Sequence, residues 1–266
     1  MSLTSDPPTP VVEFTVENLR VSVYHDRPAM ARGAALDVAR AIAARQKTAG
    51  RANVVFAAAP SQNEFLAGLV ANKEIDWSRL HAFHMDEYLG LDADHPASFR
   101  RYLAEHLFGL VGLRPEALHL IPGEKVSRPL RTCLEYEDVL RDQPIDVVCA
   151  GIGENGHLAF NDPPVADFLD PVLVKVVRLD PLCREQQVND GGFAGIDEVP
   201  THAYTLTVPA LLGAPVVSVV VPGPRKAAAV LATLKGPIAE SCPASALRRH
   251  VGARLYLDRE SARLVV

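Results

Sequence analysis

The segment IDVVCAGIGENGHLAFNDPP, residues 145–164, couples a short apolar run to a glycine-rich one. Its first part, Ile145–Ala150, is apolar and contains β-branched residues, as is typical of a strand that is covered on both faces. The part that follows contains Gly151, Gly153 and Gly156, which allow the backbone to turn sharply and to approach a ligand closely. We therefore expect a buried strand that ends in a ligand-binding loop.

Strand-type and helix-type segments alternate on both sides of this stretch. This alternation predicts one α/β domain built on a mostly parallel, doubly wound, Rossmann-like sheet with helices on both faces. In such folds ligands bind beyond the carboxyl ends of the strands, so we look for a site in the loops there. Further strands are expected at Leu19–Tyr24, Asn53–Ala58, Leu80–Met85, Leu118–Ile121, Leu173–Val177, Thr205–Val208, Val216–Val221 and Arg254–Leu257, and helices at Pro28–Thr48, Ser61–Asn72, Ala97–Leu107, Arg128–Arg141 and Arg225–Leu234.

The composition fits a globular chain and excludes several classes of protein. Of the 266 residues, 48% are hydrophobic and 22% are charged, and the formal net charge is −5. Low-complexity disorder is therefore not expected, nor is a general nucleic-acid binder, which would carry a basic excess. The four cysteines form no C-x-x-C pair, which is typical of a reduced, cytoplasmic protein without a zinc ribbon.

The start of the chain, MSLTSDPPTP, is proline-rich and lacks the basic and apolar regions of a secretory signal. We expect residues 1–10 to be a flexible lead-in and residues 11–266 to form the single domain. No apolar stretch approaches the ~18 residues that a membrane span needs, so no membrane partner is expected.

Two of the loops after strands have features that suit an anion. Ser61 and Glu64 form a capping-box pattern, which predicts that Ser61 caps the next helix. The free N–H groups of such a helix end suit a phosphate, although an ordinary cap without a ligand is the commoner explanation. Arg225 and Lys226 are expected in a first helical turn, where the helix dipole disfavours cations and an anionic ligand would relieve the conflict. A solvated basic pair is the alternative.

A third loop carries two adjacent carboxylates. Asp86 and Glu87 directly follow an apolar strand, so Asp86 is a candidate base at the strand tip, with a helix cap or turn residue as the alternative. Together with His81 and His84 they also suggest a metal site. Alternation along a strand would scatter these side chains over both faces, so we expect no metal here.

The glycine-rich loop supplies a histidine with an acid behind it. Asp162 follows His157 by five residues, and an acid that orients an imidazole is a common arrangement for proton transfer. The pattern G-x-G-x-x-G also occurs at residues 151–156, but it lies in mid-chain and no long helix follows, so a dinucleotide site is not indicated. The sequence contains neither G-x-S-x-G nor G-x-x-x-x-G-K-[ST]. The loops together favour an enzyme that acts on a small phosphorylated metabolite over a binding module.

Three segments of the chain resemble the glucosamine-6-phosphate deaminase family, which shares its fold with 6-phosphogluconolactonase. They are FHMDEYLGL (Phe83–Leu91), HPASF (His95–Phe99) and GIGENGHLAFNDP (Gly151–Pro163). Tyr88 and the run AFND at 159–162 resemble the deaminase branch more closely than the lactonase branch.

The resemblance implies a role for each matching residue. Asp86 would shuttle a proton between C2 and C1 of the sugar, and Glu87 would complete its motif. His157, supported by Asp162, would assist the opening of the pyranose ring, and Lys226 would bind the phosphate. The implied reaction converts glucosamine 6-phosphate to fructose 6-phosphate and ammonium. It implies no cofactor and no metal, because the substrate carbonyl is the electron sink.

Three positions depart from the family pattern. Asn155 stands where the well-studied branch has a second aspartate, which changes the charge balance around the histidine. The phosphate loop, Pro60–Asn63, lacks the usual threonine and glycine, and Gln187 falls where a phosphate-binding arginine is expected, with Arg184 as its nearest substitute. The implied catalytic residues are thus Asp86, Glu87, Asn155, His157 and Asp162, and the implied substrate-binding and phosphate-binding residues are Ser61, Gln62, Asn63, Gly153, Gly156, Arg184, Gln187 and Lys226.

These observations predict a cytoplasmic, deaminating aldose–ketose isomerase whose partner is a small-molecule sugar phosphate. The first alternative is a 6-phosphogluconolactonase, because lactone hydrolysis relies chiefly on the histidine, whereas deamination also needs the carboxylate of Asp86. The second is a non-catalytic sugar-phosphate-binding protein. The sequence leaves open which amino sugar is used, whether its phosphate is required, and whether the chain forms a homo-oligomer.

Overall fold

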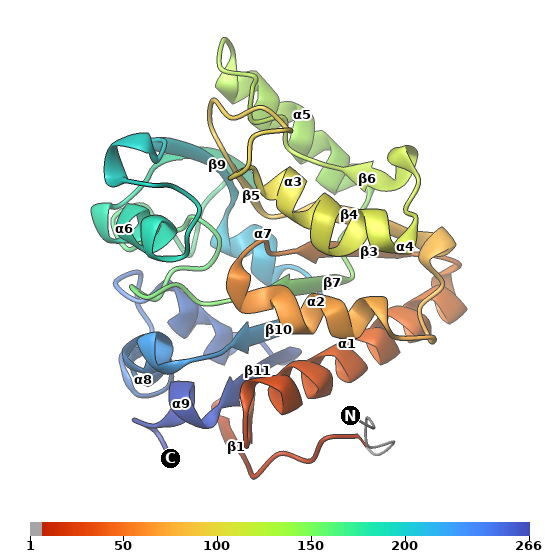
Figure 1. Cartoon of the computed structure of the whole chain (residues 1–266), viewed down its shortest axis with the longest axis vertical. Coiled ribbons are helices and arrows are strands. Elements are labelled where there is room, and N and C mark those ends of the chain that lie inside the picture. The colour runs from red at the N-terminus through yellow and green to blue at the C-terminus, as the bar shows by residue number, and fades with distance from the viewer. Residues whose placement is uncertain (1–6) are drawn as a thin grey trace.

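A computed structural model describes residues 7–266, and an eight-stranded sheet forms its centre (Figure 1). The strand order is β1-β2-β11-β10-β7-β3-β4-β6, and neighbouring strands are parallel except for β1 and β2. The predicted lead-in, residues 1–10, lies mostly outside the described residues. The strands are β1 (Val12–Val16), β2 (Leu19–Tyr24), β3 (Ala52–Phe56), β4 (Leu80–His84), β6 (Leu118–His119), β7 (Val147–Ala150), β10 (Val216–Val221) and β11 (Ala253–Asp258).

Helices cover both faces of this sheet, as the alternation predicts. In β3, Val54 and Phe56 pack into one apolar core with α1 and α2, while Val55 packs into the other core with α5 and α8. Burial on both faces is the reason why the central strands are continuously apolar. None of the described helices is long and apolar enough to cross a membrane. The helices are α1 (Arg27–Ala49), α2 (Asn63–Val70), α3 (Phe99–Leu103), α4 (Gly109–Val111), α5 (Pro129–Asp142), α6 (Pro181–Asn189), α7 (Val208–Leu212), α8 (Ala227–Lys235) and α9 (Arg259–Ala262).

A second, three-stranded antiparallel sheet corrects part of the sequence prediction. It contains β5 (Asp86–Tyr88), β9 (His202–Leu206) and β8 (Val174–Arg178) in the order β5-β9-β8. The strands expected near residues 173–177 and 205–208 therefore pair with each other and not with the main sheet. Apolar alternation identifies a strand but not its partner, which contacts distant in sequence decide. This sheet packs over a small core of Tyr88, Phe160, Val177, Leu179, Cys183, Phe193, Val199 and Ala203.

The ends of α1 follow directly from its sequence. The carboxylate of Asp26 accepts a hydrogen bond from the N–H of Ala29 at 2.8 Å, which caps the start of the helix. Gly50 ends the helix in the left-handed conformation, with φ of 84°.

The capping box predicted at Ser61 does not form. Ser61 lies inside a 3₁₀ turn, Pro60–Gln62, and its side chain makes no capping hydrogen bond to α2. Glu64 instead pairs with Arg27 of α1 at 2.7 Å, so a contact distant in sequence replaces the local one.

The direction of winding reverses between β3 and β7. From β3 the chain proceeds through β4 to β6 on one side, and from β7 through β10 to β11 on the other. At such a switch point the loops that leave the two neighbouring strands diverge and open a crevice at their carboxyl ends. In Figure 1, β10 points toward the side of the molecule on which α6 lies, and this side carries the candidate site.

Candidate active site

A narrow cleft lies at the carboxyl ends of β3, β4, β7 and β10, where the fold predicts a ligand site. It encloses about 60 Å³. Its lining residues are Ala57, Ala58, Ala59, Ser61, Gln62, Met85, Asp86, Phe99, Gly151, Ile152, Gly153, His157, Ala159, Phe160, Gln186, Gln187 and Lys226.

Asp86, the first residue of β5, faces this cleft. The side chain is 7% exposed and, among residues 7–266, has no hydrogen-bond or ion-pair partner. Burial, and then the negative charge of Glu87, raises the pKa of the Asp86 carboxyl well above its usual value. An unpaired carboxyl that faces the cleft and has a raised pKa is suited both to accept and to return a proton.

Glu87 lies outside the cleft, which corrects its implied place in the catalytic site. Its side chain is fully buried and accepts hydrogen bonds from the N–H groups of Tyr88, Phe99 and Arg100 and from the hydroxyl of Ser98. It also pairs with the guanidinium of Arg100 at 3.2 Å. Glu87 therefore accepts hydrogen bonds from N–H groups at the start of α3. Because neighbouring residues of a strand point to opposite faces, its side chain points away from that of Asp86.

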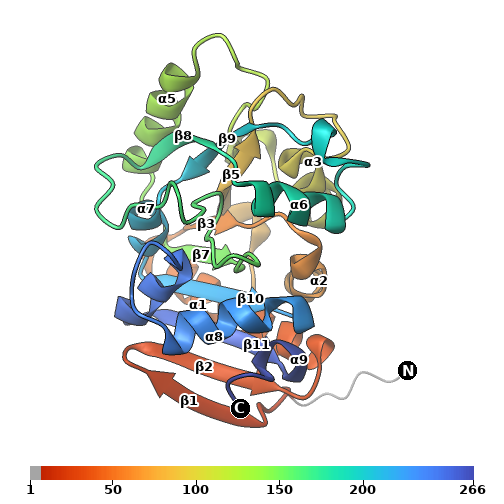
Figure 2. The same ribbon diagram turned by 90° about the vertical axis from the view of Figure 1, so that its left-hand side faces the viewer.

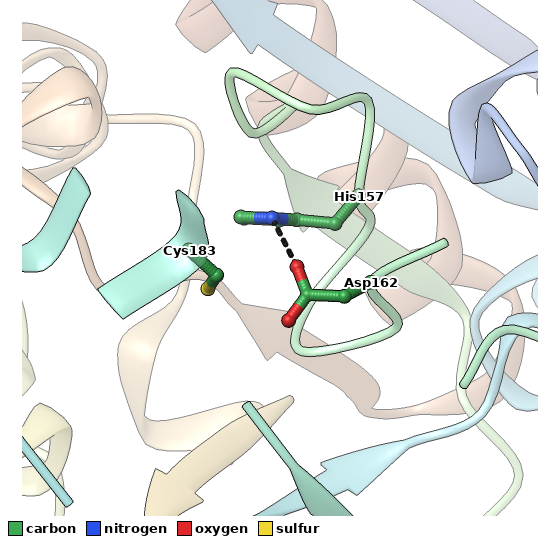
Figure 3. Close-up of side chains that lie close together, drawn as sticks. All are labelled: His157, Asp162 and Cys183. Carbon is green, nitrogen blue, oxygen red and sulfur yellow. Dashed lines mark ion pairs between the residues drawn. The ribbon is translucent and has the colours of Figure 1, made fainter. Parts of the chain in front are cut away.

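His157 and Asp162 are in contact, as their spacing predicts. The Nδ1 atom of His157 lies 2.9 Å from Oδ1 of Asp162, which is completely buried (Figure 3). The imidazole lines the cleft, so its Nε2 is the ring nitrogen left for a ligand. Burial by itself raises the pKa of Asp162, but contacts from His157, Asn155 and the N–H of Asp180 outweigh burial and lower it.

Asn155 joins the two groups of this pair. Its Nδ2 donates to Oδ1 of Asp162 at 2.9 Å, and its Oδ1 accepts from the backbone N–H of His157 at 3.1 Å. Asn155 thus faces the carboxylate more directly than it faces the imidazole ring. It does not line the cleft and acts on the site through Asp162.

Cys183 of α6 lies beside the same pair (Figure 3). Ligand atoms of His157, Asp162 and Cys183 lie within 4.8 Å of one another, and nitrogen, oxygen and sulfur together could ligate an ion such as Zn²⁺. The 2.9 Å contact pairs His157 and Asp162 with each other. Burial, followed by the charge of Asp162, raises the pKa of Cys183 well above its usual value.

The other candidate metal ligands, around β4, do not converge. His84 is fully buried, and burial lowers its pKa to about 3, so its ring is neutral. His81 lies near the start of β4, whereas His84 lies at its end, and Nδ1 of His81 is 3.0 Å from Nε2 of His119. Asp86 faces the cleft and Glu87 faces α3. The scatter expected from strand alternation is therefore present.

Lys226 marks the end of the cleft that suits an anion. It is 8% exposed and, within residues 7–266, no other lysine or arginine lines the cleft. Burial lowers its pKa, and nearby acids raise it again in part. Ser61, Gln62 and Gln187 line the same cleft, whereas Arg225 turns away and pairs with two acidic side chains at 2.6 and 3.4 Å.

Two predicted phosphate ligands lie outside the cleft. The guanidinium of Arg184 donates to the carbonyls of Ile196 and Val199 at 2.5 and 2.8 Å, so it holds the segment after α6 instead of replacing a phosphate-binding arginine. The side chain of Asn63 accepts a hydrogen bond from the hydroxyl of Tyr102. Both side chains already have partners within the chain.

The glycines of the loop serve two different purposes. A Cβ atom at Gly153 would lie 2.1 Å from the imidazole of His157, so only glycine leaves room for that ring. Gly156 has φ of 86° and backs onto Cys242, 2.8 Å from where its Cβ would be, so it shapes the turn without lining the cleft. Ala159, which lines the cleft, also has a positive φ of 49°, which is uncommon for a residue with a side chain.

Sequence reasoning missed α6 and therefore some of the lining that it supplies. Gln186 and Gln187 both line the cleft from this helix, and Gln187 accepts a hydrogen bond from the hydroxyl of Tyr88 at 2.8 Å. The available signal was the pair Asp180-Pro181, because aspartate before proline is a common start of a helix.

Comparisons with known proteins agree with this geometry. The family described as glucosamine-6-phosphate isomerases/6-phosphogluconolactonase matches residues 25–164. A glucosamine-6-phosphate deaminase of Listeria monocytogenes serotype 4a (strain HCC23) is 33% identical over 218 residues, which are 82% of this chain and 90% of that protein. One of Lactobacillus helveticus (strain DPC 4571) is 31% identical over 211 residues, or 79% and 85% of the two chains.

Solved structures show the same relationship. A monomeric glucosamine-6-phosphate deaminase superposes with a TM-score of 0.83 at 28% identity, covering 92% of this chain and 99% of that one. The 6-phosphogluconolactonase of Thermotoga maritima shares the fold, with a TM-score of 0.73 at 20% identity over 90% and 99% of the chains. The match to the family over more than half of the chain confirms the resemblance seen in the sequence. This chain belongs to the glucosamine-6-phosphate isomerase/6-phosphogluconolactonase family.

Proposed function

We propose that the protein is a cytoplasmic deaminase that converts glucosamine 6-phosphate and water to fructose 6-phosphate and ammonium. The observation that carries this proposal is the placement of Asp86 and His157 on one narrow cleft with Lys226. An unpaired carboxyl, an imidazole backed by an acid, and one buried cation match the three tasks of the reaction. These are proton transfer between carbons, ring opening and retention of the phosphate.

Ring opening is the task that suits His157. Its Nε2 can accept the proton of the anomeric hydroxyl and deliver one to the ring oxygen, which yields the open-chain aldehyde. Contact of Nδ1 with Asp162 fixes the ring orientation and stabilises the imidazolium that forms during the transfer. Asn155 supports this arrangement by holding the same carboxylate oxygen.

Proton transfer between carbons is the task that suits Asp86. In the open-chain sugar the carboxylate would take the proton from C2, and the electron pair would move onto the aldehyde oxygen, which takes up a proton to give the enol. The carboxyl would then return the proton to C1, which leaves an imine at C2. The amine nitrogen gives up one proton when the imine forms, so the protons balance. Addition of water to C2 and departure of ammonium complete the reaction. The raised pKa of Asp86 brings its basicity closer to that of the carbon acid and enol that exchange the proton.

Lys226 and the turn Pro60–Gln62 are the proposed phosphate site. One buried ammonium together with hydroxyl and amide donors can hold a phosphate, although it offers fewer charges than an arginine pair would. Because the phosphate lies away from the reacting carbons, these groups bind the ground state and the transition state alike.

Three substrates test the proposal against its alternatives. The protein is incubated with glucosamine 6-phosphate, galactosamine 6-phosphate and 6-phosphogluconolactone, and ammonium release and lactone loss are measured. Release of ammonium from an amino sugar supports the deaminase, and comparing the two epimers identifies the stereochemistry. Lactone turnover without ammonium release would refute the deaminase and favour a 6-phosphogluconolactonase. No turnover of any of the three substrates would favour a non-catalytic binding protein.

A further inference from the structure

A second cavity lies away from the cleft, against the opposite ends of the strands. It has a volume of about 560 Å³, within the range of about 300–1,000 Å³ that is usual for small-molecule sites. It opens between α1 and the first residues of β2, β10 and β11, whereas the cleft lies beyond the carboxyl ends of the strands. Figure 1 shows α1 lying along β10 and β11, and Figure 2 shows the same strands from the side.

One row of residues across three strands supplies polar and positively charged groups to this cavity. Arg20 of β2 is in register with Arg254 of β11, which is in register with Ser218 of β10. All three line the cavity, together with Asp37 and Arg40 of α1. Like charges directly opposite each other on neighbouring strands repel, so a negative charge beside this exposed pair of arginines is favourable.

The protein supplies only part of that charge. Asp37 pairs with Arg254 at 2.8 Å and lies 3.7 Å from Arg40. Within residues 7–266, Arg20 has no ion pair and no side-chain hydrogen bond, and Glu13, in the neighbouring groove, accepts its hydrogen bond from a serine instead. Three arginines and one aspartate leave the lining with a net charge of +2.

A second, independent observation also points to a ligand. Ser218 is 2% exposed, and its hydroxyl has no hydrogen-bond partner among the described residues. A buried hydroxyl without a partner is costly, and most such groups in proteins are satisfied. A ligand oxygen in the cavity that accepts a hydrogen bond from Ser218 would remove this cost.

We propose that this cavity binds the phosphate group of a small phosphate monoester, independently of the reaction in the cleft. A phosphate monoester carries a charge close to −2 near neutral pH, which balances the lining, and its oxygens suit the forked donors of arginine and a hydroxyl. The lining also includes Val38, Ala41 and Val216, whose apolar side chains suit the organic body of such a molecule.

Binding of inorganic phosphate, measured by isothermal titration calorimetry, tests the site. The Lys226→Ala variant is used as the parent protein so that the cleft contributes less to the signal. Into it we introduce Arg20→Gln or Ser218→Ala, and as a control Arg32→Gln, which removes an arginine of α1 that does not line the cavity. Loss of a charge-assisted hydrogen bond is expected to weaken phosphate binding about tenfold or more in Arg20→Gln, and to weaken it also in Ser218→Ala, but not in the control.

Equal phosphate affinity in the parent, Arg20→Gln and Ser218→Ala would overturn the proposal, as would equal weakening by Arg32→Gln. Titrations with glucose 6-phosphate and adenosine 5′-monophosphate then identify the organic body, since the matching ester should bind more tightly than inorganic phosphate. If both esters bind more weakly than phosphate, the cavity does not accept a monoester. Turnover in the wild-type background should be unchanged by Arg20→Gln, so this test stands apart from the test of the deaminase.

Discussion

Replacing Asp86 by asparagine separates the chemical role of this carboxyl from its effect on stability. Asparagine fills the same space but cannot accept the C2 proton, so turnover should fall about 10²–10⁴-fold, the usual contribution of a general acid–base group. That loss corresponds to about 3–5 kcal/mol of activation free energy. The substrate KM should change little, because the phosphate and ring contacts remain.

Folding should respond in the opposite direction. Because burial raises the pKa of Asp86, this carboxyl costs the folded state no stability at low pH, where it is neutral in both the folded and the unfolded state. Its contribution becomes destabilising as the pH rises from the unfolded pKa of about 3.9 through the raised folded pKa. Asp86→Asn has no such loss, so its advantage in melting temperature should grow with pH. Each kcal/mol is worth about 2–4 °C for a chain of this size.

Two measurements check the reasoning. Ammonium release gives kcat and KM, and thermal unfolding at pH 4, 6 and 8 gives the difference in melting temperature between variant and wild type. Asp92→Asn, which changes an exposed carboxyl nearby, is the matched control and should leave both unchanged. A kcat within threefold of wild type would remove Asp86 as the proton shuttle. A melting-temperature difference that shrinks as the pH rises would refute a buried carboxyl with a raised pKa.

Three further variants test the rest of the site. Lys226→Ala should raise KM for glucosamine 6-phosphate with little change in kcat, while a change confined to kcat would contradict a phosphate site; steady-state kinetics decide this. Asn155→Asp removes a hydrogen bond from Asp162 and adds a negative charge, which raises the pKa of Asp162, so the acidic limb of kcat/KM should move to higher pH. A limb that stays in place would show that Asp162 does not control the rate. Glu87→Gln removes a charge that raises the pKa of Asp86, so the ionisation that Asp86 contributes to the acidic side of the profile should move to lower pH, with a loss of about 1–3 kcal/mol in folding free energy. Unchanged stability in denaturant unfolding would contradict the structural role given to Glu87.

The sequence by itself determined most of the main sheet and the core of the candidate site. The strand predicted at Val216–Val221 and the helix predicted at Pro28–Thr48 match β10 and α1 closely, because apolar periodicity and caps are local properties. The contact of His157 with Asp162 was also predictable, since both residues lie in one short loop whose glycines allow the backbone to turn sharply.

The tertiary structure alone decided features that depend on residues far apart in the chain. It placed β8 and β9 in a second sheet with β5, turned Glu87 toward Arg100, and used Arg184 to hold backbone carbonyls. Nothing in the local pattern distinguishes these outcomes, because a side chain's partner is set by packing between elements. The row of Arg20, Arg254 and Ser218 is the extreme case. Arg20 lies about 200 or more positions from the other two residues in the sequence, and Ser218 and Arg254 lie on parallel strands that a crossover connects. Only the register of the parallel sheet brings the three residues to one cavity.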